Sequence, residues 1–153
     1  MDKKTVFKHK KPDDSAGFLL WKITSLWQNK LSNILSVFKI NQTQFAIMAS
    51  LKWFEEHNEE TTQAHLVEHS KIEKMTVSKS LKNLENKNLI IRVKSKRDAR
   101  ALNIEFTKKG INTINKAIVA IEKADDEFFS SLSAQELKQY KSIIVKVIKN
   151  NGL

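Results

Sequence analysis

The chain has 153 residues, enough to bury a hydrophobic core, and we expect it to form a single domain over 1–153. It contains no cysteine, which excludes a disulfide framework, a cysteine-based zinc site and a thiol redox switch. Three glycines and one proline indicate a mostly helical fold, and a net charge of +10 favours an anionic partner such as nucleic acid.

Two helices are predicted in the first third of the chain. Apolar residues recur at steps of three and four over 15–38, which indicates one buried face of a long helix. Ser15 or Asp14 is a suitable N-cap for it. A second helix should begin after Asn41, whose side chain can form a capping box with Gln44.

Two further helices follow, separated by a short turn. The third is short and should begin at Thr61 or Thr62. The fourth is predicted over 74–87, and its buried stripe consists of Val77, Leu81 and Leu84.

A change of periodicity then predicts a β-hairpin. Residues 89–93 and 102–106 are short, β-branched or alternating segments, and a charged stretch separates them. Thr107 can cap a fifth helix, and Ser133 can form a capping box with Glu136 at the start of a sixth. A helix pair followed by a hairpin predicts a mainly α fold with a small β wing, the winged helix-turn-helix, whose DNA-binding lobe spans 41–107.

The charge is concentrated in this lobe. Residues 71–109 contain twelve Lys or Arg against four acidic residues, a net charge of +8, whereas five Glu cluster between 55 and 68. Such segregation favours a nucleic-acid surface over a general lysine bias of composition. The fourth helix presents side chains that suit base edges and phosphates: Lys74, Met75, Thr76, Ser78, Lys79 and Lys82. The alternative is an ordinary solvated helix face.

Several segments resemble the MarR family of transcription regulators. The stretch 62–69 resembles its positioning helix, 75–85 its recognition helix, and 88–90 the exit from that helix. The stretches 97–100 and 104–110 are similar to the wing signature, Asp-x-Arg followed by Leu-Thr-x-x-Gly. Asn88 stands where the family usually has Gly, and Phe106 where it has Leu. Asn tolerates the left-handed conformation that ends a helix, so the first departure costs little.

The resemblance implies a homodimer that binds double-stranded DNA at a pseudo-palindromic operator and acts as a repressor. Its dimerisation helices would be 15–38 and 108–150. In the wing, the resemblance points to Arg100 as the side chain that enters the minor groove, with Asp98 positioning it through a charge-assisted hydrogen bond and Arg97 nearby. A hairpin tip that charge merely keeps in solution is the alternative.

The resemblance also implies a small aromatic or anionic effector, bound between the dimerisation helices and the DNA-binding lobe. Candidate lining residues are Trp21, Trp27, Phe45 and Met48. The same aromatic and apolar residues could instead belong to the core or to the dimer interface. Two rival functions remain: a sequence-tolerant architectural DNA-binding protein without an effector, and a winged-helix adaptor for other proteins.

Other classes of site have little support in the sequence. His65 and His69 have a spacing that can bind metal, but capping or solvated histidines fit them better, so we expect neither a metal nor another cofactor. Phosphate-loop and hydrolase motifs are absent, so we do not expect an enzyme. Without a segment long enough to span a membrane or an apolar signal run, we expect a cytoplasmic protein.

Overall fold

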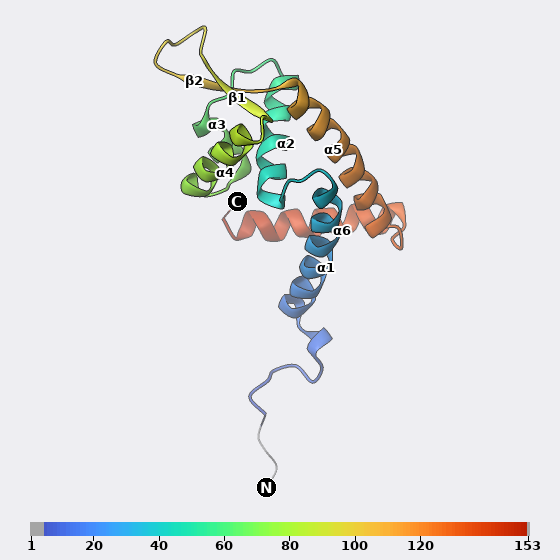
Figure 1. Cartoon of the computed structure of the whole chain (residues 1–153). Coiled ribbons are helices and arrows are strands. Elements are labelled where there is room, and N and C mark those ends of the chain that lie inside the picture. Colours follow the sequence, from blue (N-terminus) through green and yellow to red (C-terminus); the bar gives the residue numbers. More distant parts are fainter. Residues whose placement is uncertain (1–4, 153) are drawn as a thin grey trace.

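The computed structural model describes residues 5–152, which form six helices, one short 3₁₀ turn and one two-stranded sheet (Figure 1). In chain order the elements are η1 (Pro12–Asp14), α1 (Ala16–Val37), α2 (Gln42–Glu56), α3 (Gln63–Ser70), α4 (Lys74–Asn86), β1 (Ile90–Lys94), β2 (Leu102–Phe106), α5 (Lys108–Phe128) and α6 (Ala134–Asn150). The predicted fold class, a mainly α winged helix-turn-helix, is therefore confirmed.

Most of the predicted helix starts are confirmed by hydrogen-bonded caps. The side-chain oxygens of Ser15, Asn41, Thr62, Thr107 and Ser133 each accept a backbone N–H from the first turn of the helix that follows. Each cap satisfies one of the backbone donors that a helix start leaves without a partner. The local sequence therefore fixes where these helices begin.

The predicted start of β1 was wrong by one residue. Asn88 adopts the left-handed conformation (φ 57°), and the N–H of Leu89 donates to the carbonyl of Leu84 at 3.0 Å. Leu89 thus takes part in the turn that ends α4, and the strand begins at the next residue. From Ile90 onward the two strands pair antiparallel, with Ile90 opposite Phe106.

The winged lobe closes on one hydrophobic core. The completely buried side chains from α2, α3 and α4 pack with residues of the hairpin, of α5 and of the end of α1: Leu35, Ile47, Met48, Leu66, Val77, Leu81, Leu84, Ile90, Ile104 and Ile114. This core holds α4 and the base of the hairpin in fixed relative positions.

The junction between the hairpin and α5 is unusually close. Gly110 is buried, and a Cβ atom added there would overlap the carbonyl oxygen of Leu89. The N–H of Thr107 donates to the same carbonyl at 3.1 Å, and its hydroxyl donates to the carbonyl of Asn88. Glycine at position 110 therefore lets α5 begin directly beside the end of α4.

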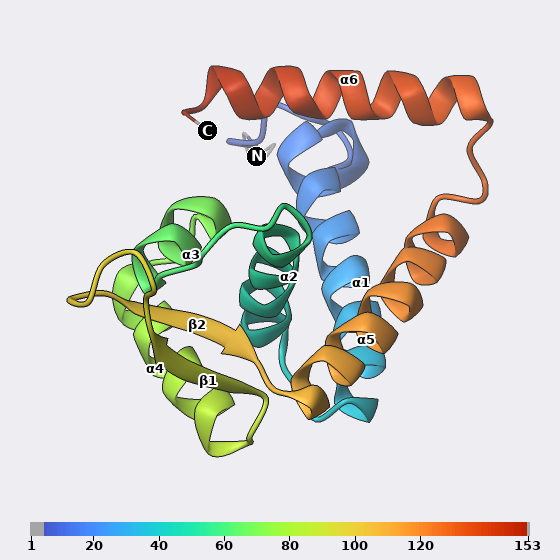
Figure 2. The ribbon, with the colours of Figure 1, turned by 90° about the horizontal axis from the view of Figure 1, so that it is seen from above.

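Helices α1 and α5 pack side by side, whereas α6 extends across the end of α1 and stands apart from the lobe (Figure 2). No residue of α6 is buried. Large apolar side chains on α6 and on α1 are exposed, among them Ile143 (61%), Val147 (52%), Trp21 (72%) and Leu26 (62%). Among the helices of residues 5–152, none is long and apolar enough to cross a membrane.

Candidate nucleic-acid interface

Helix α4 separates into a buried and an exposed face, as its periodicity predicts. Val77, Leu81 and Leu84 are completely buried. Of the six side chains proposed for DNA contact on this helix, Lys74, Met75, Thr76, Lys79 and Lys82 are exposed, and Ser78 is half-buried at the edge of the same face. Met75 is 71% exposed, so this apolar side chain is accessible on the same face as the lysines.

A carboxylate caps the N-terminus of α4. Glu73 accepts the backbone N–H groups of Met75 and Thr76 at 3.0 and 3.1 Å, and it also accepts the hydroxyl of Thr76 at 3.2 Å. The N–H groups of Met75 and Thr76, which favour the charged form, hold the pKa of Glu73 below its ordinary value. The first turn of α4 is therefore ordered before any ligand binds.

The tip of the wing is shaped by Ser95. Its hydroxyl accepts the backbone N–H groups of Arg97 and Asp98, both at 3.1 Å, and donates to the carboxylate of Glu60 at 2.7 Å. This hydroxyl, followed by the Asn103 side chain, holds the pKa of Glu60 below its ordinary value. Glu60 lies in the loop between α2 and α3, so the tip is tied to the body of the lobe.

The predicted hydrogen bond between Asp98 and Arg100 is present and is made to the backbone of Arg100. Asp98 Oδ1 accepts the main-chain N–H of Arg100 at 2.9 Å, so the contact is with the backbone of Arg100 and not with its guanidinium. Arg97 and Arg100 are both exposed, and within residues 5–152 neither forms an ion pair. Asp98 therefore fixes the turn through the backbone, while the side chains of Arg97 and Arg100 are exposed to solvent.

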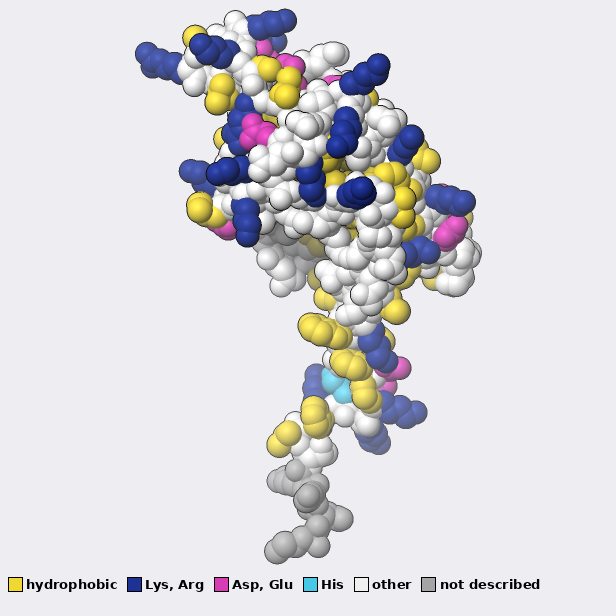
Figure 3. Space-filling view, viewed as in Figure 1, with side chains coloured by type: hydrophobic (Ala, Val, Ile, Leu, Met, Phe, Trp, Pro, Cys, Tyr) yellow, Lys and Arg dark blue, Asp and Glu magenta, His cyan; other side chains and the backbone are white. Residues whose placement is uncertain are grey.

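The structure places α4 and the wing tip on the same side of the lobe (Figures 1 and 2). In the space-filling view, Lys and Arg side chains lie over the hairpin and over the region of α4, and others lie over α5 and near the start of α1, where exposed apolar side chains are also seen (Figure 3). The two elements that carry the sequence-predicted site residues of 74–82 and 97–100 thus lie on one side of the lobe.

Three cations of the basic segment stabilise the lobe itself. Lys87 donates to the carbonyl of Lys39 at 2.8 Å, and Lys109 donates to the carbonyl of Lys87 at 3.1 Å. Arg92 forms an ion pair with Glu85 at 3.1 Å, which braces the hairpin against α4. The charges available for an external partner are therefore fewer than the sequence count suggests.

The four proposed effector residues occupy different environments. Met48 is completely buried in the core, and Phe45 packs against that core. Trp27 meets Phe128 of α5 edge-on at 5.1 Å, whereas Trp21 is 72% exposed. Met48 thus belongs to the core, which was the alternative to a role in effector binding, and Trp27 contacts a neighbouring helix.

A cavity of about 740 Å³ lies elsewhere, between the end of α2, the α2–α3 loop and the hairpin. Its wall combines apolar side chains such as Phe106 with the carboxylates of Glu55, Glu59 and Glu60 and the ammonium groups of Lys94 and Lys96. The residues proposed for an effector are not part of its wall.

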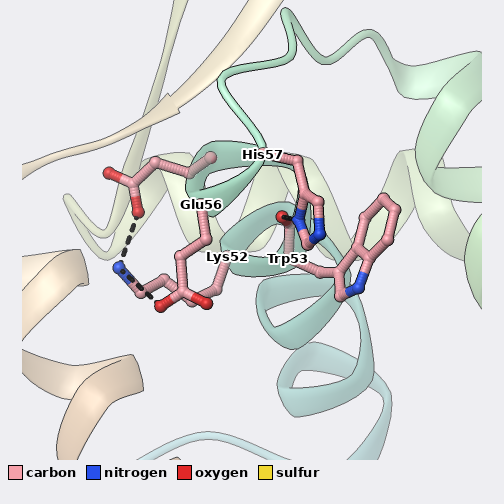
Figure 4. Close-up of polar contacts among 5 residues, drawn as sticks. Lys52, Trp53, Glu56 and His57 are labelled. Carbon is pink, nitrogen blue, oxygen red and sulfur yellow. Dashed lines mark hydrogen bonds and ion pairs between the residues drawn. The ribbon is translucent and has the colours of Figure 1, made fainter.

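The end of α2 contains a compact polar cluster (Figure 4). Lys52 lies between the carboxylates of Glu55 and Glu56, at 2.9 and 3.5 Å, and the hydrogen bond to Glu55 raises the pKa of Lys52 despite partial burial. The ring of His57 stacks on Trp53 with 4.0 Å between centroids, and its Nδ1 lies 2.7 Å from the Trp53 carbonyl. These contacts stabilise the end of the helix.

The histidine pair on α3 has capping and packing roles. His65 completes the capping box with Thr62 by accepting its N–H at Nδ1, 3.3 Å away. The Nδ1 of His69 lies 2.9 Å from the hydroxyl of Ser50, on α2. Among residues 5–152, no three potential ligands are close enough together to hold a metal ion.

Two residues important to this interface were missed in the sequence. Glu73 could have been found, because an acidic residue directly before a helical pattern is an N-terminal signal. Glu60 carried no local signal, because its partner Ser95 lies 35 positions away in the chain.

Comparisons with known proteins agree with this architecture. The family described as "ArnR1-like, winged-helix domain" matches residues 36–125. A relative described as the uncharacterized HTH-type transcriptional regulator YdcH of Bacillus subtilis (strain 168) is 34% identical over 125 residues, covering 82% of this chain and 85% of that protein.

Solved structures show the same fold. MepR of S. aureus in complex with DNA has a TM-score of 0.81 at 24% identity, covering 92% of this chain and 99% of that chain. CouR from Rhodococcus jostii bound to p-coumaroyl-CoA has a TM-score of 0.77 at 16% identity, covering 91% and 95%. A mutant of E. coli MarR complexed with operator DNA has a TM-score of 0.74 at 19% identity, covering 86% and 91%.

The family match covers more than half of the chain, and the relative from Bacillus subtilis matches most of it at an identity that indicates common descent. Together with the fold, these matches place the protein among regulators of transcription and not among enzymes. The chain belongs to the ArnR1-like winged-helix family, is related to a helix-turn-helix transcription regulator, and has the fold of the MarR regulators.

Proposed function

We propose that this protein is a homodimeric, sequence-specific DNA-binding repressor that occupies a pseudo-palindromic operator. One observation carries this proposal: the exposed face of α4 and the basic wing tip lie on the same side of a rigid lobe. In a winged helix, the recognition helix enters the major groove and its N-terminal residues contact base edges. The complexes of MepR with DNA and of MarR with operator DNA support this docking.

Lys74, Lys79 and Lys82 are the cations of α4 that fit phosphate contacts, because all three are exposed. Met75, Thr76 and Ser78 present an apolar group and hydroxyls toward base edges. In the wing, Arg97 and Arg100 are exposed on a tip whose turn Asp98 fixes, which suits insertion into a minor groove.

The exposed apolar faces support the homodimer. Trp21 and Leu26 on α1 and Ile143 and Val147 on α6 are more than half exposed, although they are large apolar side chains. Burying such faces against a second copy would remove this apolar surface from water. A two-fold dimer would also present two copies of α4 to successive major grooves, which a palindromic operator requires.

Release by a small aromatic or anionic effector is part of the proposal. The p-coumaroyl-CoA complex of CouR supports it, because it shows a ligand bound to the same fold. Trp21, Trp27 and Phe45 remain candidates for a site between the dimerisation helices and the DNA-binding lobe. Met48 is completely buried, so it would contribute to such a site only by packing against the residues that line it.

The DNA-binding part is tested by salt titration of fluorescence anisotropy on duplexes selected from a random pool and on scrambled duplexes. Lys79→Ala and Lys82→Ala should each weaken binding to both duplexes and lower the salt slope by about 0.9 per phosphate contact. Lys116→Ala, an exposed change on α5, is the matched control and should leave both quantities unchanged. Equal wild-type affinity for both duplexes would instead indicate an architectural protein.

The homodimer is tested by sedimentation velocity at micromolar concentration. The wild-type chain should sediment as a dimer, and Ile143→Glu should shift it toward the monomer because a charge would enter an apolar interface. Lys149→Gln, at an exposed position of the same helix, also makes the net charge more negative by one unit and controls for that change. A monomeric wild type at this concentration would contradict the proposed assembly.

A further inference from the structure

The start of α4 carries an unusual arrangement of hydrogen-bond acceptors. Glu73 Oε1 accepts the N–H of Met75, and Glu73 Oε2 accepts both the N–H and the hydroxyl of Thr76, at 3.1 and 3.2 Å. Both Glu73 and Thr76 are exposed, so nothing within the described chain covers them. This pair sits where a recognition helix meets base edges.

The hydroxyl of Thr76 has only one hydrogen, and it donates this hydrogen in the hydrogen bond to Glu73. A threonine hydroxyl offers one donor and two acceptor lone pairs, and an ionised carboxylate offers acceptors alone. Two N–H groups and the hydroxyl of Thr76 keep Glu73 in its ionised form. Toward the outside, Glu73 and Thr76 therefore present acceptors and no donor.

The major-groove edges of the four bases fall into two classes, those with an amino group that can donate to an acceptor-only surface and those with a keto group that cannot. Adenine and cytosine carry an amino group that donates, at N6 and at N4. Guanine O6 and thymine O4 only accept. Every base pair has one amino base and one keto base, so an acceptor-only surface distinguishes a base pair from the same pair with its strands exchanged.

We propose that Glu73 and Thr76 form a specificity-determining pair that selects adenine or cytosine over guanine or thymine, on one strand, at one position of each operator half-site. Thr76 Oγ1 accepts a hydrogen bond from the amino group of the base. Glu73 is a positioning residue that sets the direction of the Thr76 hydroxyl. The inference rests on the proposed function, which brings the N-terminus of α4 into the major groove.

Glu73→Gln is the most direct test of the pair. The glutamine amide adds two donors, and it can supply a hydrogen to Thr76 Oγ1, which frees the hydroxyl to donate to a keto group. The preference for the amino base should then fall by roughly five- to tenfold or reverse, as the loss of one net hydrogen bond implies.

Two changes at position 76 separate the hydroxyl from the shape of the side chain. Thr76→Val keeps the branched shape but removes the acceptor, so the preference should disappear. Thr76→Ser keeps the hydroxyl and its bond to Glu73, so the preference should remain. Glu68→Gln removes a negative charge from the neighbouring helix, at a side chain that is 81% exposed, and should leave the preference unchanged.

The experiment begins with selection of wild-type binding sites from a random duplex pool. Competition binding then compares the enriched duplex with duplexes in which one base pair at a time has its strands exchanged, for the wild type and the four variants. Circular dichroism melting confirms that each variant is folded, and salt titration confirms that each still binds DNA.

The inference predicts one amino-preferring position per half-site whose preference is lost in Glu73→Gln and Thr76→Val and kept in Thr76→Ser and Glu68→Gln. If the wild type binds DNA but the Glu73 and Thr76 variants keep its preference at every position, the pair does not determine specificity. If the folded wild type shows no salt-dependent duplex binding at all, the proposed function fails and the inference fails with it.

Discussion

Asp98 holds the backbone of Arg100 in the tip of the wing. Its Oδ1 accepts the Arg100 N–H at 2.9 Å, and its own carbonyl accepts the N–H of Ala101 at 3.0 Å. The two bonds turn the chain back toward β2 and leave the guanidinium of Arg100 without an ion pair among residues 5–152. The wing is thus ordered in its main chain while its cationic ends stay available to a ligand.

Arg100→Ala should weaken DNA binding on most sequences. If Arg100 enters a minor groove, its loss removes a charge-assisted contact of about 1–3 kcal/mol. The salt dependence should also become shallower, because fewer counterions are released. The measurement is a salt titration on selected and scrambled duplexes; wild-type affinity on both at all salts would show that the wing does not touch DNA.

Asp98→Asn and Asp98→Ala should behave differently. The asparagine carbonyl can still accept the N–H of Arg100, so the turn and most of the affinity should be kept. Alanine removes the acceptor, so the tip should loosen and the variant should approach the affinity of Arg100→Ala. Hydrogen exchange of the Arg100 amide reports the loosening independently; equal protection in both variants would argue against a backbone role for Asp98.

Gly110→Ala should destabilise the fold. The added methyl group would overlap the carbonyl oxygen of Leu89, which is backbone and cannot rotate away. Overpacking of this kind costs about 1–3 kcal/mol in the free energy of unfolding. Gly17→Ala is the control, because nothing lies within 4 Å of a Cβ there and alanine favours the helix. Urea unfolding compares the two, and equal stability of both variants would disprove the close contact.

Glu60→Gln should lower stability at neutral pH but not in acid. The pKa of Glu60 is held below its ordinary value by the Ser95 hydroxyl, so the folded state binds its proton less tightly than the unfolded state does. The resulting stabilisation is present above the ordinary carboxyl pKa and is lost as the pH falls through the lowered value.

The measurement for Glu60 is urea unfolding of both proteins at neutral pH and at a pH below the ordinary carboxyl pKa. The difference between wild type and Glu60→Gln should shrink in acid. Glu59→Gln, at an exposed neighbour, is the control for the loss of one negative charge. A difference that does not change with pH would show that the charge of Glu60 does not contribute.

The sequence by itself determined the element order and most helix starts. Caps such as Asn41 with Gln44 and Ser133 with Glu136 act within four residues, so their chemistry can be recognised locally. The buried stripe of α4 follows from helical periodicity alone. The left-handed conformation of Asn88 is also compatible with its residue type, because Asn tolerates this conformation better than most residues do.

Only the tertiary structure decided which polar groups remain available to a partner. Lys87 is bound to the carbonyl of Lys39, 48 positions away, and Glu60 reaches Ser95 across 35 positions. Contacts at such separations depend on how the chain closes around its core, and no periodicity in the sequence encodes them. The burial of Met48 in the core could not be predicted for the same reason. The position of a residue on a helix face does not tell whether it contacts the core or lines a ligand site.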